Sequence, residues 1–212
     1  MKKLIGCVFL MLMACNFSKE KQTVQKLPYF NSYDLTPEWG AEAKKHHIAP
    51  FQFVNQEGQK VTEQDYKGKI YVTHFFFTSC SGICQTLIKN LSILQENFKN
   101  DASVKFLSHS VTPEIDSVQK LKDYAEFHNI NSKQWNLVTG DKKAIYKQAR
   151  TSYFADDDFG ITQKPSTFIH NENFLLIDPD GCIRGVYNGT LRLEMSRITR
   201  HIKLLQEDFF NN

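Results

Sequence analysis

The chain has 212 residues, of which 41% are hydrophobic and 13% aromatic, and its formal net charge is +3. This composition is typical of one globular domain with a substantial core, and it excludes a disordered chain. A small net charge without a basic run gives no reason to expect nucleic-acid binding. We therefore expect one folded domain whose partners are not nucleic acids.

The first residues have the pattern of a secretory signal rather than of a folded element. Two lysines precede an apolar run over 4–14, which is too short to span a bilayer. Residues 12–15, Leu-Met-Ala-Cys, resemble the bacterial lipobox, in which cleavage before the cysteine is followed by its lipidation. A short core helix is the competing interpretation, and the charged start and the abrupt polar change afterwards argue against it. We expect a lipoprotein signal peptide over 1–14 and a membrane anchor at Cys15, with the domain in the periplasm or otherwise outside the cytoplasmic membrane.

Residues 15–45 are polar and lack a steady period, so we expect a tether that leads into an irregular arm. Four aromatic residues suggest that the second half of this arm is packed rather than free in solvent: Tyr29, Phe30, Tyr33 and Trp39. The folded domain is expected to occupy 46–212.

The sequence of the expected domain predicts an alternation of strands and helices. Alternating apolar residues around a turn at 55–58 predict a hairpin over 51–62, and a nearly continuous apolar run predicts a buried strand over 70–77. The later elements are predicted in this order: a helix from Ile83 through Phe98, a strand over 104–108, a helix over 112–128, a strand over 135–138, a helix capped by Asp141, strands over 165–169 and 174–177, a turn at 178–181, a strand over 182–187, and a closing helix with Leu191, Met195, Ile198, Ile202 and Leu205 on its inner face. This order predicts an α/β fold, a central mixed β-sheet flanked by helices on both faces, with an extra N-terminal hairpin.

Cys80 and Cys84 stand where the strand over 70–77 ends and the next helix begins. In open α/β sheets, ligands and reactive groups collect at the carboxyl ends of strands. The unpaired N–H groups and positive end of a helix N-terminus favour a thiolate over a thiol. The sequence therefore predicts a reactive or metal-binding pair at this position.

The spacing of the two cysteines permits two kinds of chemistry. If both were helical, their Cβ atoms would lie roughly 5–6 Å apart, too far for a relaxed disulfide but suitable for sharing a metal ion. If Cys80 lay in the loop before the helix, a disulfide would also be within reach. A purely structural disulfide is the plainer interpretation, although one that closes so short a loop stabilises little. A metal-bound dithiolate and a disulfide both remain open.

The other cysteines have simpler interpretations. Cys7 leaves with the signal and Cys15 carries the lipid, so Cys182 is the odd thiol beside the Cys80 and Cys84 pair. It follows the glycine of the 178–181 turn. We expect an inert, partly buried thiol there, with a third sulfur ligand as the less favoured possibility.

A strand that runs into a cysteine loop and a helix, followed late by Asp-Pro-Asp-Gly at 178–181, resembles the thioredoxin superfamily. Within it, Phe-Thr-Ser-Cys at 77–80 with Cys84 four residues on, and His170 eight residues before the hairpin turn, is similar to the Sco/SenC family. The similarity covers about residues 47–205. Two positions beside the cysteines lack the prolines that are common in the family.

This resemblance implies a thioredoxin-like fold and a copper metallochaperone that assists assembly of the dinuclear copper site of cytochrome c oxidase subunit II, or that serves another copper-protein client. It implies that Cys80, Cys84 and His170 are the copper ligands. Two thiolates and an imidazole form a soft set that suits Cu(I) and tolerates Cu(II), and zinc is the competing metal. His170 is one of seven histidines, and only its position before the hairpin selects it.

Two other functions remain open. One is an envelope thiol–disulfide oxidoreductase of the TlpA or peroxiredoxin type, which would be an enzyme. The residues before Phe174 favour a metal carrier, because thioredoxin-like oxidoreductases usually place a proline immediately before this strand and this chain has Asn173 there. The other is a redox or copper sensor that acts through a partner protein.

Overall fold

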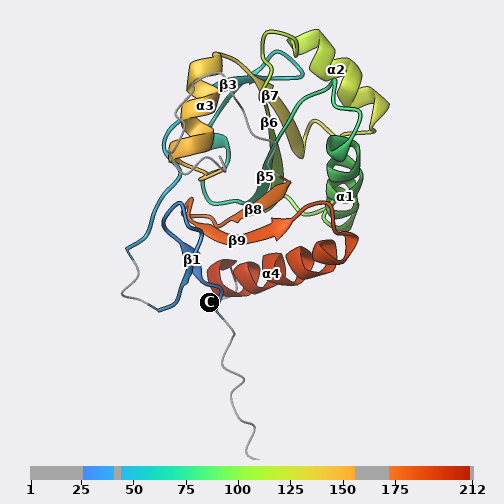
Figure 1. Cartoon of the computed structure of the whole chain (residues 1–212). Helices are drawn as coiled ribbons and strands as arrows, with labels where there is room; N and C mark the ends of the chain where they lie inside the picture. The colour runs from blue at the N-terminus through green and yellow to red at the C-terminus, as the bar shows by residue number, and fades with distance from the viewer. Residues whose placement is uncertain (1–25, 41–43, 156–171, 211–212) are drawn as a thin grey trace, which may run out of the picture.

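A computed structural model describes residues 26–40, 44–155 and 172–210 of the chain (Figure 1). The strands are β1 (Tyr29–Phe30), β2 (Pro37–Glu38), β3 (Gln52–Asn55), β4 (Lys60–Thr62), β5 (Ile70–Phe76), β6 (Val104–Ser110), β7 (Trp135–Thr139), β8 (Asn173–Ile177) and β9 (Ile183–Asn188). The helices are α1 (Ile83–Asn97), α2 (Val118–Phe127), α3 (Lys142–Thr151) and α4 (Arg192–Phe210), with a short 3₁₀ turn at Glu63–Asp65.

Seven of these strands form one sheet in the order β4-β3-β7-β6-β5-β8-β9. The three inner strands β5, β6 and β7 are parallel, and the outer pairs are antiparallel. Figure 1 shows α1 and α4 beside one face of the sheet and α3 across the other. The predicted mixed sheet with helices on both faces and the hairpin over 51–62 are thus confirmed.

The alternation of side chains along β5 explains why the sheet is covered twice. Val72 and Phe76 lie in a core cluster with α1, α2 and α4, whereas Tyr71 and Phe75 lie in a second cluster with α3. Successive side chains of a strand point to opposite faces, so a strand with apolar residues on both faces needs cover on both sides. All seven residues of β5 are buried, as the continuous apolar run predicted.

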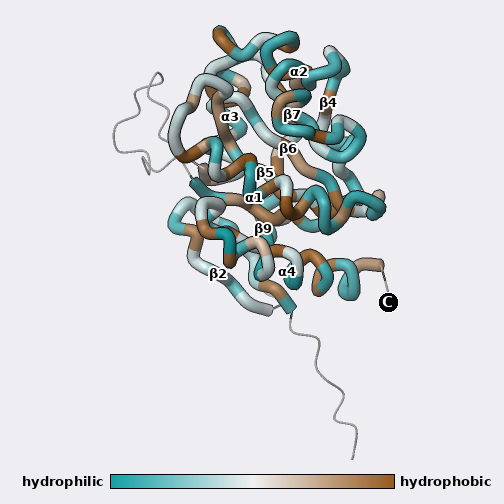
Figure 2. The backbone as a smooth tube through the Cα atoms, turned by 90° about the vertical axis from the view of Figure 1, so that its right-hand side faces the viewer, coloured by the Kyte–Doolittle hydropathy of each residue, from teal (hydrophilic) through white to brown (hydrophobic). Residues whose placement is uncertain are grey.

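The closing helix α4 packs its apolar stripe on the sheet. Met195, Ile198, Ile202 and Leu205 are buried, and brown and teal residues alternate along the helix in Figure 2. The prediction for Leu191 is wrong, because this residue precedes α4 and is 54% exposed.

The predicted helix start at Thr112 is also wrong. The Thr112 carbonyl accepts hydrogen bonds from the N–H groups of Ile115 and Asp116, each at 2.8 Å, which closes a turn instead of a helix. The helix begins at Val118, where the Ser117 side chain caps it by accepting a hydrogen bond from the Lys120 N–H at 3.2 Å. The Thr-Pro-Glu pattern has the residues of a helix start, but the Thr112 hydroxyl donates a hydrogen bond to the buried Asp116 instead of capping a helix.

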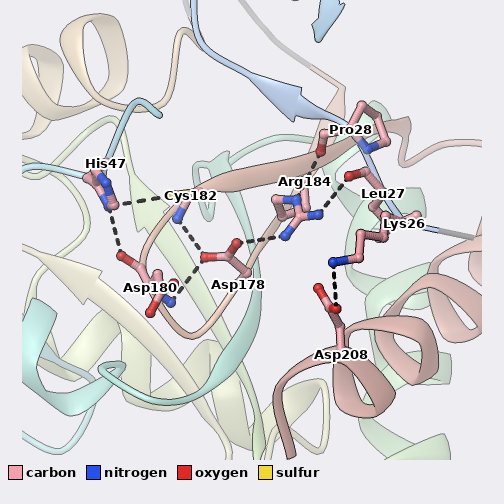
Figure 3. A network of polar contacts seen from close by, with 9 residues as sticks. All are labelled: Lys26, Leu27, Pro28, His47, Asp178, Asp180, Cys182, Arg184 and Asp208. Atoms are coloured by element: carbon pink, nitrogen blue, oxygen red, sulfur yellow. Dashed lines mark hydrogen bonds and ion pairs between the residues drawn. The ribbon is translucent and has the colours of Figure 1, made fainter. Parts of the chain in front are cut away.

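The N-terminal arm is held by one buried arginine (Figure 3). The Arg184 guanidinium donates to the Leu27 carbonyl at 2.6 Å, the Pro28 carbonyl at 3.0 Å and the Asp178 carboxylate at 3.0 Å, and it lies 4.0 Å from the centre of the Tyr29 ring. The arm therefore packs as expected, and its strands β1 and β2 pair into a small ribbon that the sequence did not predict.

One aromatic residue of the arm does not pack as predicted. Trp39 is 62% exposed, although it belongs to the group of aromatic residues that suggested a packed arm.

Several predictions fall outside the described residues: the signal over 1–14, the anchor at Cys15, the strand over 165–169 and the ligand His170. They remain predictions, as do the domain limits. The structure contains no helix, among the residues it describes, that is long and apolar enough to cross a bilayer.

Two buried histidines should make stability depend on pH. Burial lowers the pKa of His74 and of His109 from 6.5 to about 3. Between these values the unfolded chain binds two protons that the folded chain does not, so stability falls as the pH falls below 6.5. Each histidine should contribute a loss of about 1.4 kcal/mol per pH unit.

His109→Phe tests this expectation, because the ring stacks on Phe75 with centroids 4.9 Å apart and the aromatic contact is kept. In urea unfolding between pH 6 and 4, the wild type should lose about 1.4 kcal/mol more per pH unit than the variant. Equal slopes for the two proteins would contradict a neutral, buried His109.

Candidate functional site

The two cysteines lie at the carboxyl end of β5, a central strand of the sheet. Cys80 sits in the loop after β5, whereas Cys84 is the second residue of α1. Both side chains are buried, Cys80 being 9% and Cys84 3% exposed. Of the two geometries that the sequence left open, the structure has the one with Cys80 outside the helix, and neither thiol is in a disulfide.

The amino end of α1 gives the two thiols opposite acidities. Burial alone would raise the pKa of Cys80, but hydrogen bonds from the Cys84 thiol and from the N–H groups of Cys84 and Gly82 outweigh burial and lower it. The Cys80 sulfur thereby accepts hydrogen bonds from N–H groups that have no partner within the helix. Burial, followed by the hydrogen bond to Cys80, raises the pKa of Cys84 to about 12. Cys80 is therefore the more acidic of the two thiols, and its thiolate accepts a hydrogen bond from the Cys84 thiol.

A buried carboxylate fixes the start of the cysteine loop. Asp116 accepts hydrogen bonds from the Thr78 hydroxyl at 2.5 Å and from the Thr78 N–H at 3.2 Å. It also accepts from the hydroxyl groups of Ser110 at 2.6 Å and Thr112 at 3.1 Å. Asp116 is fully buried, so each of these contacts is shielded from water. The loop before Cys80 is thus attached to the end of β6 and the turn before α2.

A shallow hollow of about 350 Å³ lies beside this loop, with Thr78 and Gln85 on its wall. Tyr124 of α2 also lines it, and its buried hydroxyl has no hydrogen-bond partner among the described residues. Burial first, and then the charges of Cys84 and Cys80, raise the pKa of Tyr124. Tyr124 therefore lies close enough to the two sulfurs to feel their charge.

The start of β8 lies at the same end of the sheet as the cysteines. Leu175 pairs with Thr73 of β5 and β8 runs antiparallel to β5, so the residues before Leu175 lie toward the carboxyl end of β5. Close packing at Gly189 fixes this segment: its N–H donates to the Glu172 carbonyl at 2.8 Å, and its carbonyl accepts from the Asn90 amide of α1 at 2.7 Å.

A side chain at position 189 has no room in this arrangement. A Cβ there would lie 2.7 Å from Leu87 of α1 and 2.9 Å from the Glu172 carbonyl oxygen. Glycine therefore lets the start of β8 approach the first turns of α1, the helix that carries Cys84.

Cys182 lies at the other end of the sheet. It follows the tight turn between β8 and β9, and Ile177 at that end pairs with Tyr71 near the start of β5. Its sulfur is 3.5 Å from His47 Nδ1, it is 1% exposed, and burial raises its pKa to about 12. The expectation of a buried, inert thiol agrees with this position.

The described residues bring together two of the three predicted metal ligands. They contain no group of three or more histidine, cysteine or acidic residues close enough to hold a metal ion. His170 lies outside these residues. The two adjacent sulfurs, one with a lowered pKa, form a donor pair suited to a soft cation.

Sequence reasoning missed the role of Asp116 and of Gly189. Asp116 stands between the hydroxyl-rich stretch 108–112 and Ser117, and only the fold shows that Thr78 is its partner. Gly189 follows β9 directly, and a glycine at the end of a strand is a signal for close backbone approach.

The chain matches a protein-family model described as SCO1/SenC over residues 40–206. It is also similar to solved structures. One is BsSco, a member of the Sco family of cytochrome c oxidase assembly proteins in which a disulfide switch was identified. It is 30% identical with a TM-score of 0.65, over 77% of this chain and 95% of that chain.

Two further solved structures are similar to this chain. One is a SCO1/SenC family lipoprotein from Bacillus anthracis, 30% identical with a TM-score of 0.68, over 79% of this chain and 99% of that one. The other is ScoI from Bradyrhizobium japonicum with copper bound, 26% identical with a TM-score of 0.58, over 73% of this chain and 99% of that one.

The opposite acidities of the two thiols can be tested by alkylation of the reduced, metal-free protein. Iodoacetamide should modify Cys80 first, with a midpoint below pH 9, because its thiolate is stabilised by the Cys84 thiol and by N–H groups. Cys84→Ala removes one donor to the thiolate and should raise that midpoint.

Cys84→Ser is the matched control, because its hydroxyl still donates to the Cys80 sulfur and the midpoint should move less. Mass spectrometry of the alkylated peptides against pH gives both midpoints. Faster modification of Cys84 than of Cys80 in the wild type would contradict the assignment.

Proposed function

The chain belongs to the SCO1/SenC family, and on that premise we propose that it carries copper, binding it through the Cys80 and Cys84 thiolates with His170 as the third ligand. The observation that carries the proposal is the pair of adjacent sulfurs at the amino end of α1, the first of which has a lowered pKa. Thiolate ligands select Cu(I) among the common metal ions. The copper-bound ScoI structure is a related protein in which the metal is present.

Binding of Cu(I) changes the proton count of the pair. The Cys84 thiol, with its pKa raised to about 12, is protonated at neutral pH, so it must lose its proton when it becomes a ligand. Cys80 is the first donor to an entering ion, because its lowered pKa lets it lose a proton more readily than Cys84. Two thiolates leave bound Cu(I) with a net charge of −1 and bound Cu(II) neutral, so both states suit this buried position.

The position of β8 supports His170 as the third ligand. Glu172 is the first described residue before β8 and lies against α1 through its contact with Gly189. His170 is two residues earlier, so the chain allows at most about 7 Å between the two Cα atoms. An imidazole donor beside two thiolates would make Cu(II) binding tolerable as well as Cu(I) binding.

The proposed client is the dinuclear copper site of cytochrome c oxidase subunit II. Support comes from the related BsSco, which belongs to a family of cytochrome c oxidase assembly proteins. Another copper protein is the alternative client. The proposed cell-envelope location rests on the lipobox-like residues 12–15 and on the related Bacillus anthracis protein, a lipoprotein.

A second candidate function is reduction of a client disulfide. The loop position of Cys80 puts a disulfide with Cys84 within reach, and a disulfide switch was identified in the related BsSco. In this reaction the Cys80 thiolate attacks the client disulfide, and Cys84 then releases the client as a dithiol. The client takes up two electrons from the pair and two protons, one from the Cys84 thiol and one from solvent, and the pair becomes a disulfide.

Anaerobic titration with Cu(I) separates these two functions. The reduced mature chain should bind one copper per molecule, and Cys80→Ser or Cys84→Ser should abolish tight binding, because one thiolate cannot hold the ion alone. Cys182→Ser is the matched control and should bind like the wild type, since that thiol lies at the opposite end of the sheet. Unchanged stoichiometry in either site variant would rule out the assignment, and a wild type that takes up no copper but reduces disulfides would favour the second function.

His170→Ala should weaken Cu(II) binding more than Cu(I) binding. Two thiolates alone can hold Cu(I) in a linear site, whereas Cu(II) prefers more ligands and accepts imidazole. Competition titrations with chelators for each oxidation state measure both affinities. Equal losses for the two ions, or no loss, would contradict the role proposed for His170.

A further inference from the structure

A second cavity lies away from the thiols, between the N-terminal arm and α4. Its volume is about 330 Å³, and its wall includes Pro28, Trp39, Tyr187, Arg197, Arg200 and His201. We call it the arm cavity. The arm contributes aromatic and proline residues and Lys26, and β9 and α4 contribute the other charged and polar ones.

The charged residues that line the arm cavity are all cations: Lys26, Arg184, Arg197 and Arg200. Lys26 pairs with Asp208 at 3.6 Å, as Figure 3 shows, and Arg197 pairs with Glu194 at 3.2 Å. Both are weak surface pairs, with side chains 74% and 51% exposed on the basic side. Arg200 is exposed and makes no ion pair in the described part of the chain.

The inner wall of the arm cavity shows the effect of this charge. Burial first, and then the charges of Arg197 and Arg200, lower the pKa of His201 to about 4. Its Nδ1 lies 2.8 Å from the Tyr187 hydroxyl, so the ring is held against β9. A neutral imidazole facing two guanidinium groups indicates a positive potential at this wall, where Glu194 pairs with Arg197 and Arg200 has no acidic partner among the described residues.

Trp39 makes this cavity different from an ordinary basic patch. It is 62% exposed and lies on the rim of the cavity. An indole combines an apolar face with an N–H donor, and tryptophan is enriched where membrane proteins meet lipid headgroups. The structure therefore places an exposed aromatic residue next to exposed arginines.

The chain enters the described structure at this same place. Lys26 is the first described residue and lines the arm cavity, and Arg184 holds the next two residues by their carbonyl groups. A lipid at Cys15 would be joined to Lys26 by eleven peptide bonds, which span at most about 40 Å. With that anchor, the face that carries the cavity is the face tied to the membrane.

We propose that the arm cavity binds the headgroup of an anionic phospholipid, with Arg197 and Arg200 contacting the phosphate and Trp39 lying at the level of the headgroups. Charge complementarity supports this occupant, and the point of chain entry supports a membrane rather than a soluble anion. The orientation of this face toward the membrane rests on the proposed anchor at Cys15. Each arginine near an anionic surface adds an attraction that salt screens.

The test uses residues 16–212 without lipid, which retain every described element and both core clusters. Their binding is measured by sedimentation with vesicles of phosphatidylcholine alone, or of phosphatidylcholine and phosphatidylglycerol in equal parts. The two tryptophans also report directly, because Trp135 is fully buried and a blue shift of emission must come from Trp39. We expect binding and a blue shift only with phosphatidylglycerol.

The paired substitution Arg197→Gln and Arg200→Gln should weaken vesicle binding at least about tenfold. The matched control is Lys143→Gln with Lys147→Gln, which removes the same charge from exposed positions of α3 and should bind like the wild type. Equal weakening in both double variants, or equal binding to both kinds of vesicle, would overturn the proposal.

Inorganic phosphate tests whether the arm cavity binds a free phosphate anion instead of the phosphate of a lipid headgroup. If millimolar phosphate shifted Trp39 emission in the absence of vesicles, the site would be one for a free anion and the lipid assignment would be wrong. The experiment uses metal-free protein, so its failure leaves the copper proposal intact, and a failed copper titration leaves this one intact.

Discussion

The contact between the Cys80 sulfur and the amino end of α1 determines what this site can do. The first turn of the helix has N–H groups without a partner in the helix, and the Cys80 sulfur in the loop accepts hydrogen bonds from them. The same contact separates the acidities of two buried thiols that would otherwise both resist ionisation. A pair with one favoured thiolate can begin to bind a soft ion, or to attack a disulfide, without removing two protons at once.

The rest of the fold keeps this contact in place. β5 is buried on both faces and delivers the loop to a fixed point, and Asp116 attaches the loop to β6 and the turn before α2. Gly189 brings the start of β8 against α1 from the other side. The site is therefore assembled from segments that are far apart in the sequence, and its geometry depends on the packing of the whole sheet.

The sequence predicted the elements that local patterns determine. The apolar run of β5, the spacing of α1 and the turn between β8 and β9 are each explicit in a few neighbouring residues, and all three were confirmed. The start of α2 was wrong because a cap-like Thr-Pro-Glu pattern competes with a tertiary contact: Asp116 takes the nearby hydroxyls and leaves the cap to Ser117. No local rule predicts such a partner.

The arm shows the same limit. Its aromatic residues suggested packing, but the buried Arg184 that organises it lies far away in β9, and the exposure of Trp39 could not be inferred from its type. Arg184 follows the turn at one end of the sheet, whereas the cysteines follow β5 at the other. The fold thus separates the proposed point of attachment from the proposed point of metal transfer.

X-ray absorption at the copper edge of copper-loaded protein with residues 16–212 tests the central claim most directly, because it counts the sulfur atoms bound to the metal. The account predicts two sulfur neighbours in the wild type and in Cys182→Ser, and one in Cys84→Ser wherever residual copper remains. A single sulfur neighbour in the wild type, or two that persist in Cys84→Ser, would contradict a site built from the Cys80 and Cys84 pair.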